Sequence, residues 1–121
     1  MNITIELPWP SRILSPNARP HWASKAHCVK AARQIARLTT WYELNQLAEE
    51  DSPIRFESVR LHWTFCPPTR RTYDLDNLIA QMKSSQDGIA DALRMDDSKF
   101  KSTHAMGDVI RGGKIIVSIG D

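Results

Sequence analysis

Two aspartates stand two residues apart in the segment Tyr73-Asp74-Leu75-Asp76-Asn77. In an extended segment, side chains at positions i and i+2 project to the same side, so Asp74 and Asp76 are expected to present their carboxylates together. Two carboxylates that converge without a cation repel each other, and a bound divalent ion relieves that repulsion. Oxygen ligands select a hard cation, so the pair predicts a magnesium or manganese site. The competing interpretation is an N-cap, in which Asp76 or Asn77 accepts hydrogen bonds from the first free amides of a helix.

A second acidic pair, Asp96-Asp97, follows the helix that the sequence predicts after Asp76. A short loop into the next strand would fold the chain back and bring this pair toward the first. Asp and Ser are also common in turns between a helix and a strand, which is a simpler interpretation of Asp96-Asp97-Ser98. Lys83 lies two helical turns from Asp76 on the same side, where it could neutralise charge that builds up at a phosphate in a transition state. It could equally be an ordinary i, i+4 partner for Asp87.

Six elements are predicted to position these side chains. Alternating apolar residues predict strands, and apolar residues at helical spacing predict amphipathic helices. The expected elements are a strand over Ile3–Leu7, a helix from about Ala23 to about Glu49, a strand over Val59–Phe65, a helix from Asp76 or Asn77 to about Leu93, and strands over Phe100–Ala105 and Lys114–Ile119. This β-α-β-α-β-β order predicts an α+β fold in which two helices pack against a mixed sheet.

Each predicted helix has one apolar face. On the first helix the face is Cys28, Ala31, Ile35, Leu38 and Tyr42, and on the second it is Leu78, Met82, Ser85, Ile89 and Ala92. Gly88 in the middle of the second helix costs roughly 1 kcal/mol relative to alanine, which indicates close helix packing, including packing across a dimer. The four tryptophans are expected to be core or interface anchors, with base stacking on Trp22 as an alternative.

The chain has 121 residues, which predicts one domain over residues 1–121 with an adequate but thin core. Burial at a subunit interface would therefore add to its stability. No apolar run approaches the ~20 residues that a membrane span needs, and the N-terminus has no signal-peptide pattern. Cys28 and Cys66 lie far apart, and the histidines show no metal-ligand spacing, so we expect a reduced cytoplasmic protein without a membrane partner.

Charge is distributed unevenly along the chain. Residues 1–41 carry six basic side chains against one glutamate, whereas residues 74–97 carry six aspartates against two basic side chains. A basic half and an acidic cluster in one small domain favour an enzyme that binds a polyanion and a metal ion.

Three motifs together resemble the RusA family of Holliday junction resolvases. They are the opening strand that ends in Leu7-Pro8-Trp9-Pro10, the arginines before Asp74-Leu75-Asp76-Asn77-Leu78, and the run Asp87–Leu93 that leads into Asp96-Asp97. The resemblance covers nearly the whole chain, and the Asp-Leu-Asp-Asn motif followed at this spacing by Asp-Asp is a fairly specific signature.

The resemblance implies a homodimer with two active sites, each of which nicks one of two symmetry-related strands of a four-way DNA junction. It implies that Asp74, Asp76 and Asp97 are metal ligands, with Asp96 beside them, and that the cofactor is Mg²⁺, with Mn²⁺ as a substitute and no nucleotide. The expected products are a 5′ phosphate and a ligatable nick, as needed in DNA recombination and repair. A bacterial or phage-type protein is implied.

Basic and polar residues of the N-terminal loop resemble the DNA-contacting region of this family. Such residues usually contact phosphates and position the duplex without reading its sequence. Arg70 and Arg71 flank the carboxylates and are the better phosphate candidates. The predicted DNA-binding residues are Arg70, Arg71, Asn17, Arg19, His21, Lys25, Lys30 and Arg33.

One position departs from the family pattern. A member of the family has a functional lysine one turn after the second aspartate of the first motif, where this chain has Ala80. Lys83, one turn further on, is the expected substitute, which makes the catalytic set Asp74, Asp76, Asp97 and Lys83. The alternatives are a nuclease for flaps, forks or other branched DNA, a junction-binding protein with weak or no cleavage, and a structural oligomer whose acids only cap a helix.

Overall fold

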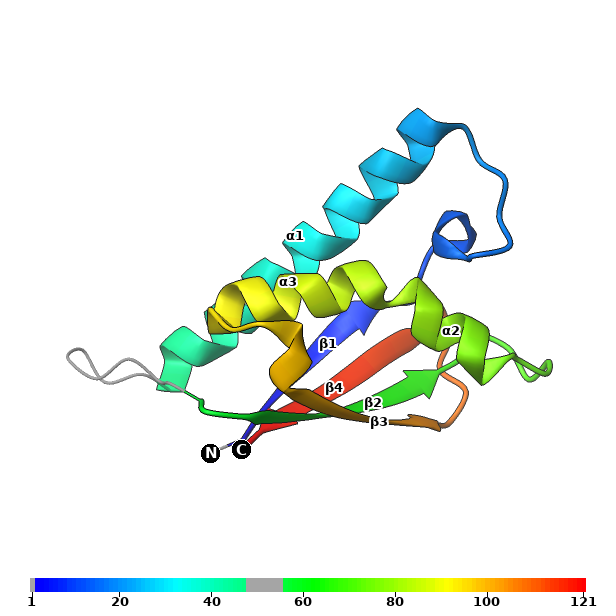
Figure 1. The fold of residues 1–121 in the computed structure, drawn as a ribbon. Coiled ribbons are helices and arrows are strands. Elements are labelled where there is room, and N and C mark those ends of the chain that lie inside the picture. The colour runs from blue at the N-terminus through cyan, green and yellow to red at the C-terminus, as the bar shows by residue number, and fades with distance from the viewer. Residues whose placement is uncertain (1, 48–55) are drawn as a thin grey trace.

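Four strands form one mixed sheet, and helices cover one of its faces (Figure 1). The computed structural model describes residues 2–47 and 56–121. The elements along the chain are β1 (Asn2–Pro8), the 3-10 turn η1 (Arg12–Leu14), α1 (Trp22–Leu47), β2 (Val59–Cys66), α2 (Leu75–Gln81), α3 (Lys83–Leu93), the 3-10 turn η2 (Asp97–Lys99), β3 (Phe100–Met106) and β4 (Lys114–Gly120). The α+β class and the mixed sheet that the sequence predicts are confirmed.

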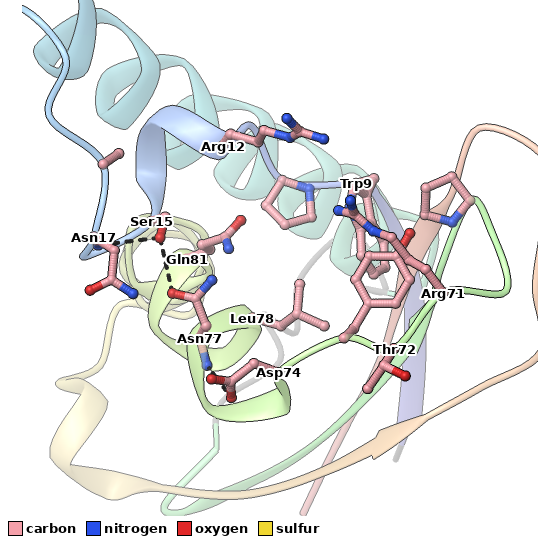
Figure 2. Close-up of a pocket in the computed structure, with 14 residues that line it drawn as sticks. Trp9, Arg12, Ser15, Asn17, Arg71, Thr72, Asp74, Asn77, Leu78 and Gln81 are labelled. Carbon is pink, nitrogen blue, oxygen red and sulfur yellow. Dashed lines mark hydrogen bonds between the residues drawn. The ribbon is translucent and has the colours of Figure 1, made fainter.

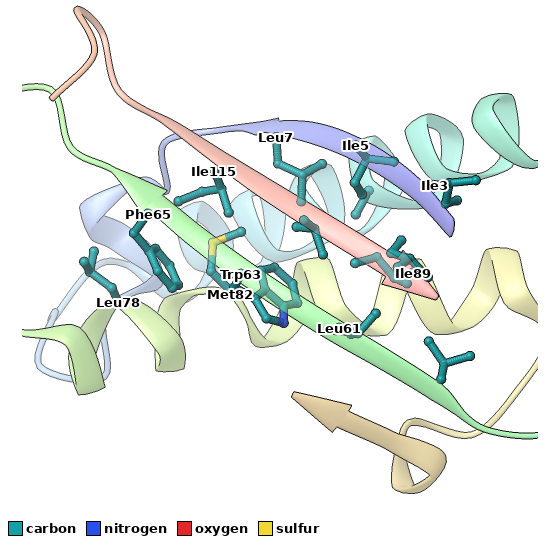
Figure 3. Close-up of a cluster of buried hydrophobic side chains, with 14 residues drawn as sticks. Ile3, Ile5, Leu7, Leu61, Trp63, Phe65, Leu78, Met82, Ile89 and Ile115 are labelled. Atoms are coloured by element: carbon teal, nitrogen blue, oxygen red, sulfur yellow. The ribbon is translucent and has the colours of Figure 1, made fainter. Parts of the chain in front are cut away.

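The strand order in the sheet is β1-β4-β2-β3. β4 pairs antiparallel with both β1 and β2, while β3 pairs parallel with β2. Val117 of β4 lies opposite Ile5 on one side and Trp63 on the other, and all three side chains are buried. This row lies at the centre of the core, on the face that the helices cover (Figure 3).

The predicted second helix is two helices. α2 begins at Leu75, one or two residues earlier than expected, and the chain turns at Met82, whose φ of −94° and ψ of 6° are not helical. The turn points α3 along α1 and leaves α2 over the end of β2 (Figure 1). The apolar face is confirmed despite the turn, because Leu78, Met82 and Ile89 are all buried.

α1 packs on α3 through small residues. An added Cβ at Gly88 of α3 would lie 2.1 Å from the carbonyl oxygen of Arg33 and 2.9 Å from Cβ of Ala36, both on α1. The close packing expected at Gly88 is therefore between two helices of the same chain. Ala36 and Thr40 are the buried residues of α1.

The larger apolar residues of α1 point away from the core. Ile35, Leu38 and Tyr42 are 43%, 48% and 59% exposed, because α1 meets α3 through the neighbouring face of Ala36 and Thr40. The helix begins at Trp22 and is described as far as Leu47, so its expected end near Glu49 lies outside the described residues. None of the described helices has the length and apolar character that crossing a membrane requires.

The hydroxyl of Thr40 is buried without a hydrogen-bond partner. Because a buried polar group without a partner is destabilising, we expect Thr40→Val to raise the free energy of unfolding by about 1 kcal/mol. Chemical denaturation of the two proteins measures this difference. Thr39→Val, at a neighbouring position that is only partly buried, is the matched control and should change stability by less than about 0.5 kcal/mol. Equal effects of the two substitutions would show that the buried hydroxyl is not the cause.

Candidate active-site cleft

A cleft of about 730 Å³ opens between the N-terminal loop, the segment before α2, and α2 itself (Figure 2). Its size is within the range of roughly 300–1,000 Å³ that is usual for small-molecule and cofactor sites. The side chains that line it are Trp9, Pro10, Arg12, Ser15, Asn17, Ala18, Pro68, Arg71, Thr72, Tyr73, Asp74, Asn77, Leu78 and Gln81.

Asp74 is the N-cap of α2 and also lines the cleft. Its backbone is extended, with φ −82° and ψ 109°, and its Oδ1 accepts a hydrogen bond of 3.3 Å from the backbone N–H of Asn77. A side chain of this segment does cap the helix, but the prediction that Asp76 or Asn77 is the cap is wrong, because the capping residue is Asp74. A carboxylate there stabilises the positive end of the helix dipole.

Asp76 lies in the first turn of α2, so the extended geometry predicted for Asp74-Leu75-Asp76 is wrong. The helix begins at Leu75, and the two-residue repeat of a strand does not apply beyond that point. Leu75 packs against the core, whereas Asp76 is exposed and does not line the cleft. Within the described part of the chain, its carboxylate makes no hydrogen bond or ion pair, which leaves both oxygens available to a ligand.

The second acidic pair has different partners. Asp96 is the N-cap of η2, and the backbone N–H of Ser98, 2.8 Å from Oδ1 of Asp96, lowers the pKa of that carboxyl. The turn between a helix and a strand is thus confirmed for Asp96. Asp97 accepts a hydrogen bond of 2.5 Å from Nζ of Lys83.

Lys83 lies between two carboxylates. Its ammonium is 2.5 Å from Oδ2 of Asp97 and 3.1 Å from Oδ1 of Asp87, so the i, i+4 pair is confirmed. These contacts raise the pKa of Lys83, with Asp97 the larger cause, and keep the side chain charged. Its contact with Asp97 links α3 to the turn that precedes β3.

The four aspartates do not gather into one cluster. Among residues 2–47 and 56–121, no three His, Cys, Asp or Glu side chains lie close enough together to hold a metal. η2, the orange turn in Figure 1, lies beneath α3 and apart from the start of α2. The donor chemistry fits a hard cation best at the start of α2, where the unpartnered carboxylate of Asp76 follows the capping carboxylate of Asp74.

The N-terminal loop is tied to α2 by a side-chain hydrogen bond. Oγ of Ser15 donates to Oδ1 of Asn77 at 3.0 Å, and it accepts from the backbone N–H of Asn17 at 3.3 Å (Figure 2). This contact joins residues 62 positions apart in the sequence and holds one side of the cleft. It also places Asn17, a predicted DNA-binding residue, in the same cleft as Asp74.

Aromatic residues form the opposite wall. Trp9 and Tyr73 meet edge to face with ring centroids 5.4 Å apart, and the guanidinium carbon of Arg71 lies 4.8 Å from the centre of the Tyr73 ring. A hydrogen bond of 2.9 Å between Tyr73 and Thr69 holds the phenol. Arg71 is therefore the predicted phosphate contact that lies in the cleft with Asp74.

The other predicted DNA-binding residues are distributed more widely. Lys25 lines a smaller recess of about 250 Å³ together with Lys83 and Ala80, and Gln81 lines both this recess and the cleft. Three of the predicted residues are exposed and line neither hollow: Arg19, Lys30 and Arg70.

Two of the predicted DNA-binding residues have partners inside the protein. Nδ1 of His21 accepts a hydrogen bond of 3.2 Å from the backbone N–H of Ala23, at the start of α1. The guanidinium of Arg33 makes two hydrogen bonds to Asp91, of 2.7 and 2.9 Å, which join α1 to α3. These contacts account for both residues structurally, and their contact with DNA stays a prediction.

Most of the lining residues were not predicted as site residues from the sequence, among them Trp9, Arg12, Tyr73 and Gln81. Tyr73 adjoins Asp74, and Trp9 belongs to the Pro-Trp-Pro motif, so the sequence offered a reason to consider both as site residues. The sequence offered no such reason for Arg12 and Gln81, because only the fold brings η1 against α2.

No family model matches the chain. An uncharacterized protein of Xylella fastidiosa (strain Temecula1 / ATCC 700964) is 40% identical over 121 residues, an alignment that covers 96% of this chain and 74% of that protein.

Proposed function

We propose that this chain, which belongs to the same family as that Xylella fastidiosa protein, is a magnesium-dependent endodeoxyribonuclease that resolves four-way DNA junctions. The observation that carries the proposal is the pair of carboxylates at the start of α2, Asp74 and the unpartnered Asp76, beside a cleft that contains Arg12 and Arg71. Oxygen donors next to guanidinium groups suit a phosphodiester and a hard cation. The RusA resemblance supports the choice of a junction as substrate and a cytoplasmic site of action.

The residues of the start of α2 would hold the ion, and the arginines would hold the DNA. Asp76 offers both carboxylate oxygens, and Asp74 offers the oxygen that does not cap the helix. A bound divalent ion would supply charge neutralisation at the scissile phosphate and activation of the attacking water. Arg71, fixed over Tyr73, orients a phosphate in the cleft.

The proposal includes Asp97 and Lys83 as the second half of the site. Lys83 reaches from α3 to Asp97 and holds that carboxylate in the absence of DNA. The charged ammonium of Lys83 would stabilise negative charge that develops on a phosphate. It would do so in place of the lysine that this chain lacks at Ala80. Asp96, which caps η2, keeps Asp97 in place.

Lys83→Ala tests that role. We expect junction cleavage to slow by about tenfold or more, because a charge that acts on the transition state is lost. Junction affinity and stability should change little, since the lysine is 62% exposed and exposed ion pairs contribute about 0–1 kcal/mol. Lys101→Ala, on the uncovered face of the sheet, is the control. An unchanged turnover in Lys83→Ala would leave the lysine as an ordinary ion-pair partner of Asp87 and Asp97.

The proposal also includes a homodimer. Its support is the exposed apolar surface of α1, formed by Ile35, Leu38, Trp41 and Tyr42. Next to this surface, a mainly apolar groove of about 190 Å³ runs between α1 and the end of β1. Exposed apolar patches of this kind are typical of protein interfaces, and a two-fold dimer would present two active sites to a two-fold junction.

Light scattering after gel filtration tests the dimer. We expect a molecular mass of two chains for the wild-type protein and of one chain for Leu38→Glu, because a charge at an apolar interface is left without a partner. Arg37→Glu, on the side of α1 that carries Lys30 and Arg33, should stay dimeric. A wild-type monomer at micromolar concentration would contradict the dimer.

Cleavage of labelled DNA tests the activity itself. The purified protein is incubated with a four-way junction, a flap, a fork and a linear duplex, each with magnesium and with EDTA. Paired symmetric nicks in the junction alone, and only with magnesium, are the expected result. Faster cutting of flaps or forks would identify a nuclease for other branched DNA.

A junction-binding protein with weak or no cleavage is the second candidate. The observation that favours it is the engagement of Lys83 by two carboxylates, together with alanine at position 80. Tight, selective binding of the junction without nicks in magnesium or manganese would establish this second function and exclude the nuclease.

A further inference from the structure

Gln81, the last residue of α2, has a buried side chain that the protein leaves without a partner. It is 7% exposed, and in the described part of the chain its carboxamide makes no hydrogen bond. It nevertheless lines the cleft (Figure 2), and it also lines the recess that contains Lys83. Most of the residue is buried, so its unpaired carboxamide can meet a hydrogen-bonding partner only from the hollows that it lines, and a ligand bound there would supply one.

The other residues that line the cleft indicate the chemical class of that ligand. Trp9 and Tyr73, which meet edge to face, give it an aromatic wall, while Ser15, Asn17 and Asn77 give it polar groups on the opposite side. The amide nitrogen of Asn77 is free to donate, because its oxygen already accepts from Ser15. An aromatic wall facing hydrogen-bonding amides suits a flat heterocycle with donors and acceptors on its edge. The carboxylate of Asp74 lies in the same cleft, so this heterocycle would be bound beside the proposed metal ligands.

We infer that the cleft binds one unstacked nucleobase of the DNA next to the scissile phosphate, and that Gln81 reads the edge of this base. The inference rests on the proposed function, because it takes the phosphate of the same nucleotide to lie near Asp74 and Arg71. A carboxamide offers a donor and an acceptor side by side, which is the pattern that pairs with the edge of a base. The aromatic residues hold the base by stacking, which every base permits, and so Gln81 supplies the discrimination.

Base removal combined with Gln81→Leu tests this inference. Leucine keeps the size of the side chain and removes both hydrogen-bonding groups. Junctions are made with an abasic nucleotide at each position around the mapped nick, and also with each of the four bases there. Binding is measured by gel shift without divalent ions, and nicking is measured with magnesium. Circular dichroism checks that each variant is folded.

For the wild-type protein, we expect one position at which base removal weakens binding by about tenfold, and a preference among the four bases at that position. In Gln81→Leu the preference should disappear and the same base removal should cost less, since the contact is already lost. Gln86→Leu, the same change in α3 outside both hollows, should behave as wild type. Trp9→Ala should weaken binding of all four bases alike, because it removes stacking without changing the hydrogen bonds.

The outcomes separate this inference from the proposed function. If the junction is bound and cut while no position is sensitive to base removal, the base-binding cleft is wrong and the nuclease stands. If Gln81→Leu keeps the base preference of the wild type, Gln81 does not read the base. If neither binding nor cutting of branched DNA is found, both the nuclease and the base-binding cleft are wrong.

Discussion

Replacing Asp76 by asparagine should abolish cleavage while leaving the fold and junction binding intact. The substitution keeps the size of the side chain and removes a negative charge that no described residue neutralises. We expect a loss of at least about a hundredfold in the cleavage rate with magnesium, as is typical when a group that stabilises a developing charge is removed. The folding cost is at most about 1 kcal/mol, the contribution of an acid in the first turn of a helix.

Two further variants make the Asp76 result specific. Asp108→Asn removes an acid from an exposed loop outside the cleft and should leave the rate unchanged. Asp74→Asn preserves the N-cap of α2, because asparagine caps helices as well as aspartate does, and should lose activity like Asp76→Asn. Cleavage at the wild-type rate by Asp76→Asn would remove that residue from the proposed metal site.

Replacing Gly88 by alanine should destabilise the protein by about 2–3 kcal/mol. The new Cβ would lie 2.1 Å from a backbone carbonyl oxygen of α1, which cannot move without shifting the helix. This loss is expected even though alanine is preferred to glycine in helix interiors by about 1 kcal/mol. The measurement is urea denaturation at equilibrium, compared with the wild-type protein.

Ala92→Gly is the matched control for Gly88→Ala. It makes the reverse change in the same helix and should lose about 1 kcal/mol from helix propensity alone. A Gly88→Ala protein as stable as the wild type would show that α1 and α3 do not approach as closely as the structure places them.

Local pattern predicted most of the fold. The strands followed from alternation, since a half-buried strand must place apolar residues at every second position, as Ile3, Ile5 and Leu7 do. The turn at Met82 could not be predicted, because no proline or glycine marks it and the apolar spacing continues across it. The buried face of α1 could not be predicted either, because the helix contacts α3 through Ala36 and Thr40 and not through its largest apolar residues.

The candidate site was predictable only in part. Asp74 followed from the sequence as a candidate metal ligand, although not as the cap of the helix, and Arg71 followed from its closeness to Asp74. The relation between Asp76 and Asp97 depends on how α2, α3 and η2 fold around one another, which residue spacing does not determine. Gln81 lies in the cleft only because η1 is tied against α2 by Ser15 and Asn77, and no local pattern encodes a contact of that range.

The central place of β4 in the sheet has a consequence for how the chain folds. Among the strands that the structure describes, β1 pairs with β4 alone, and β4 also separates β1 from β2. During synthesis, the first strand therefore has no strand to pair with until residues 114–120 have been made, although α1 can already pack on it. Contacts of such long range predict slow folding and an interval in which β1 can pair with other chains. We therefore expect a nascent chain halted before residue 114 to need a chaperone to stay free of aggregation.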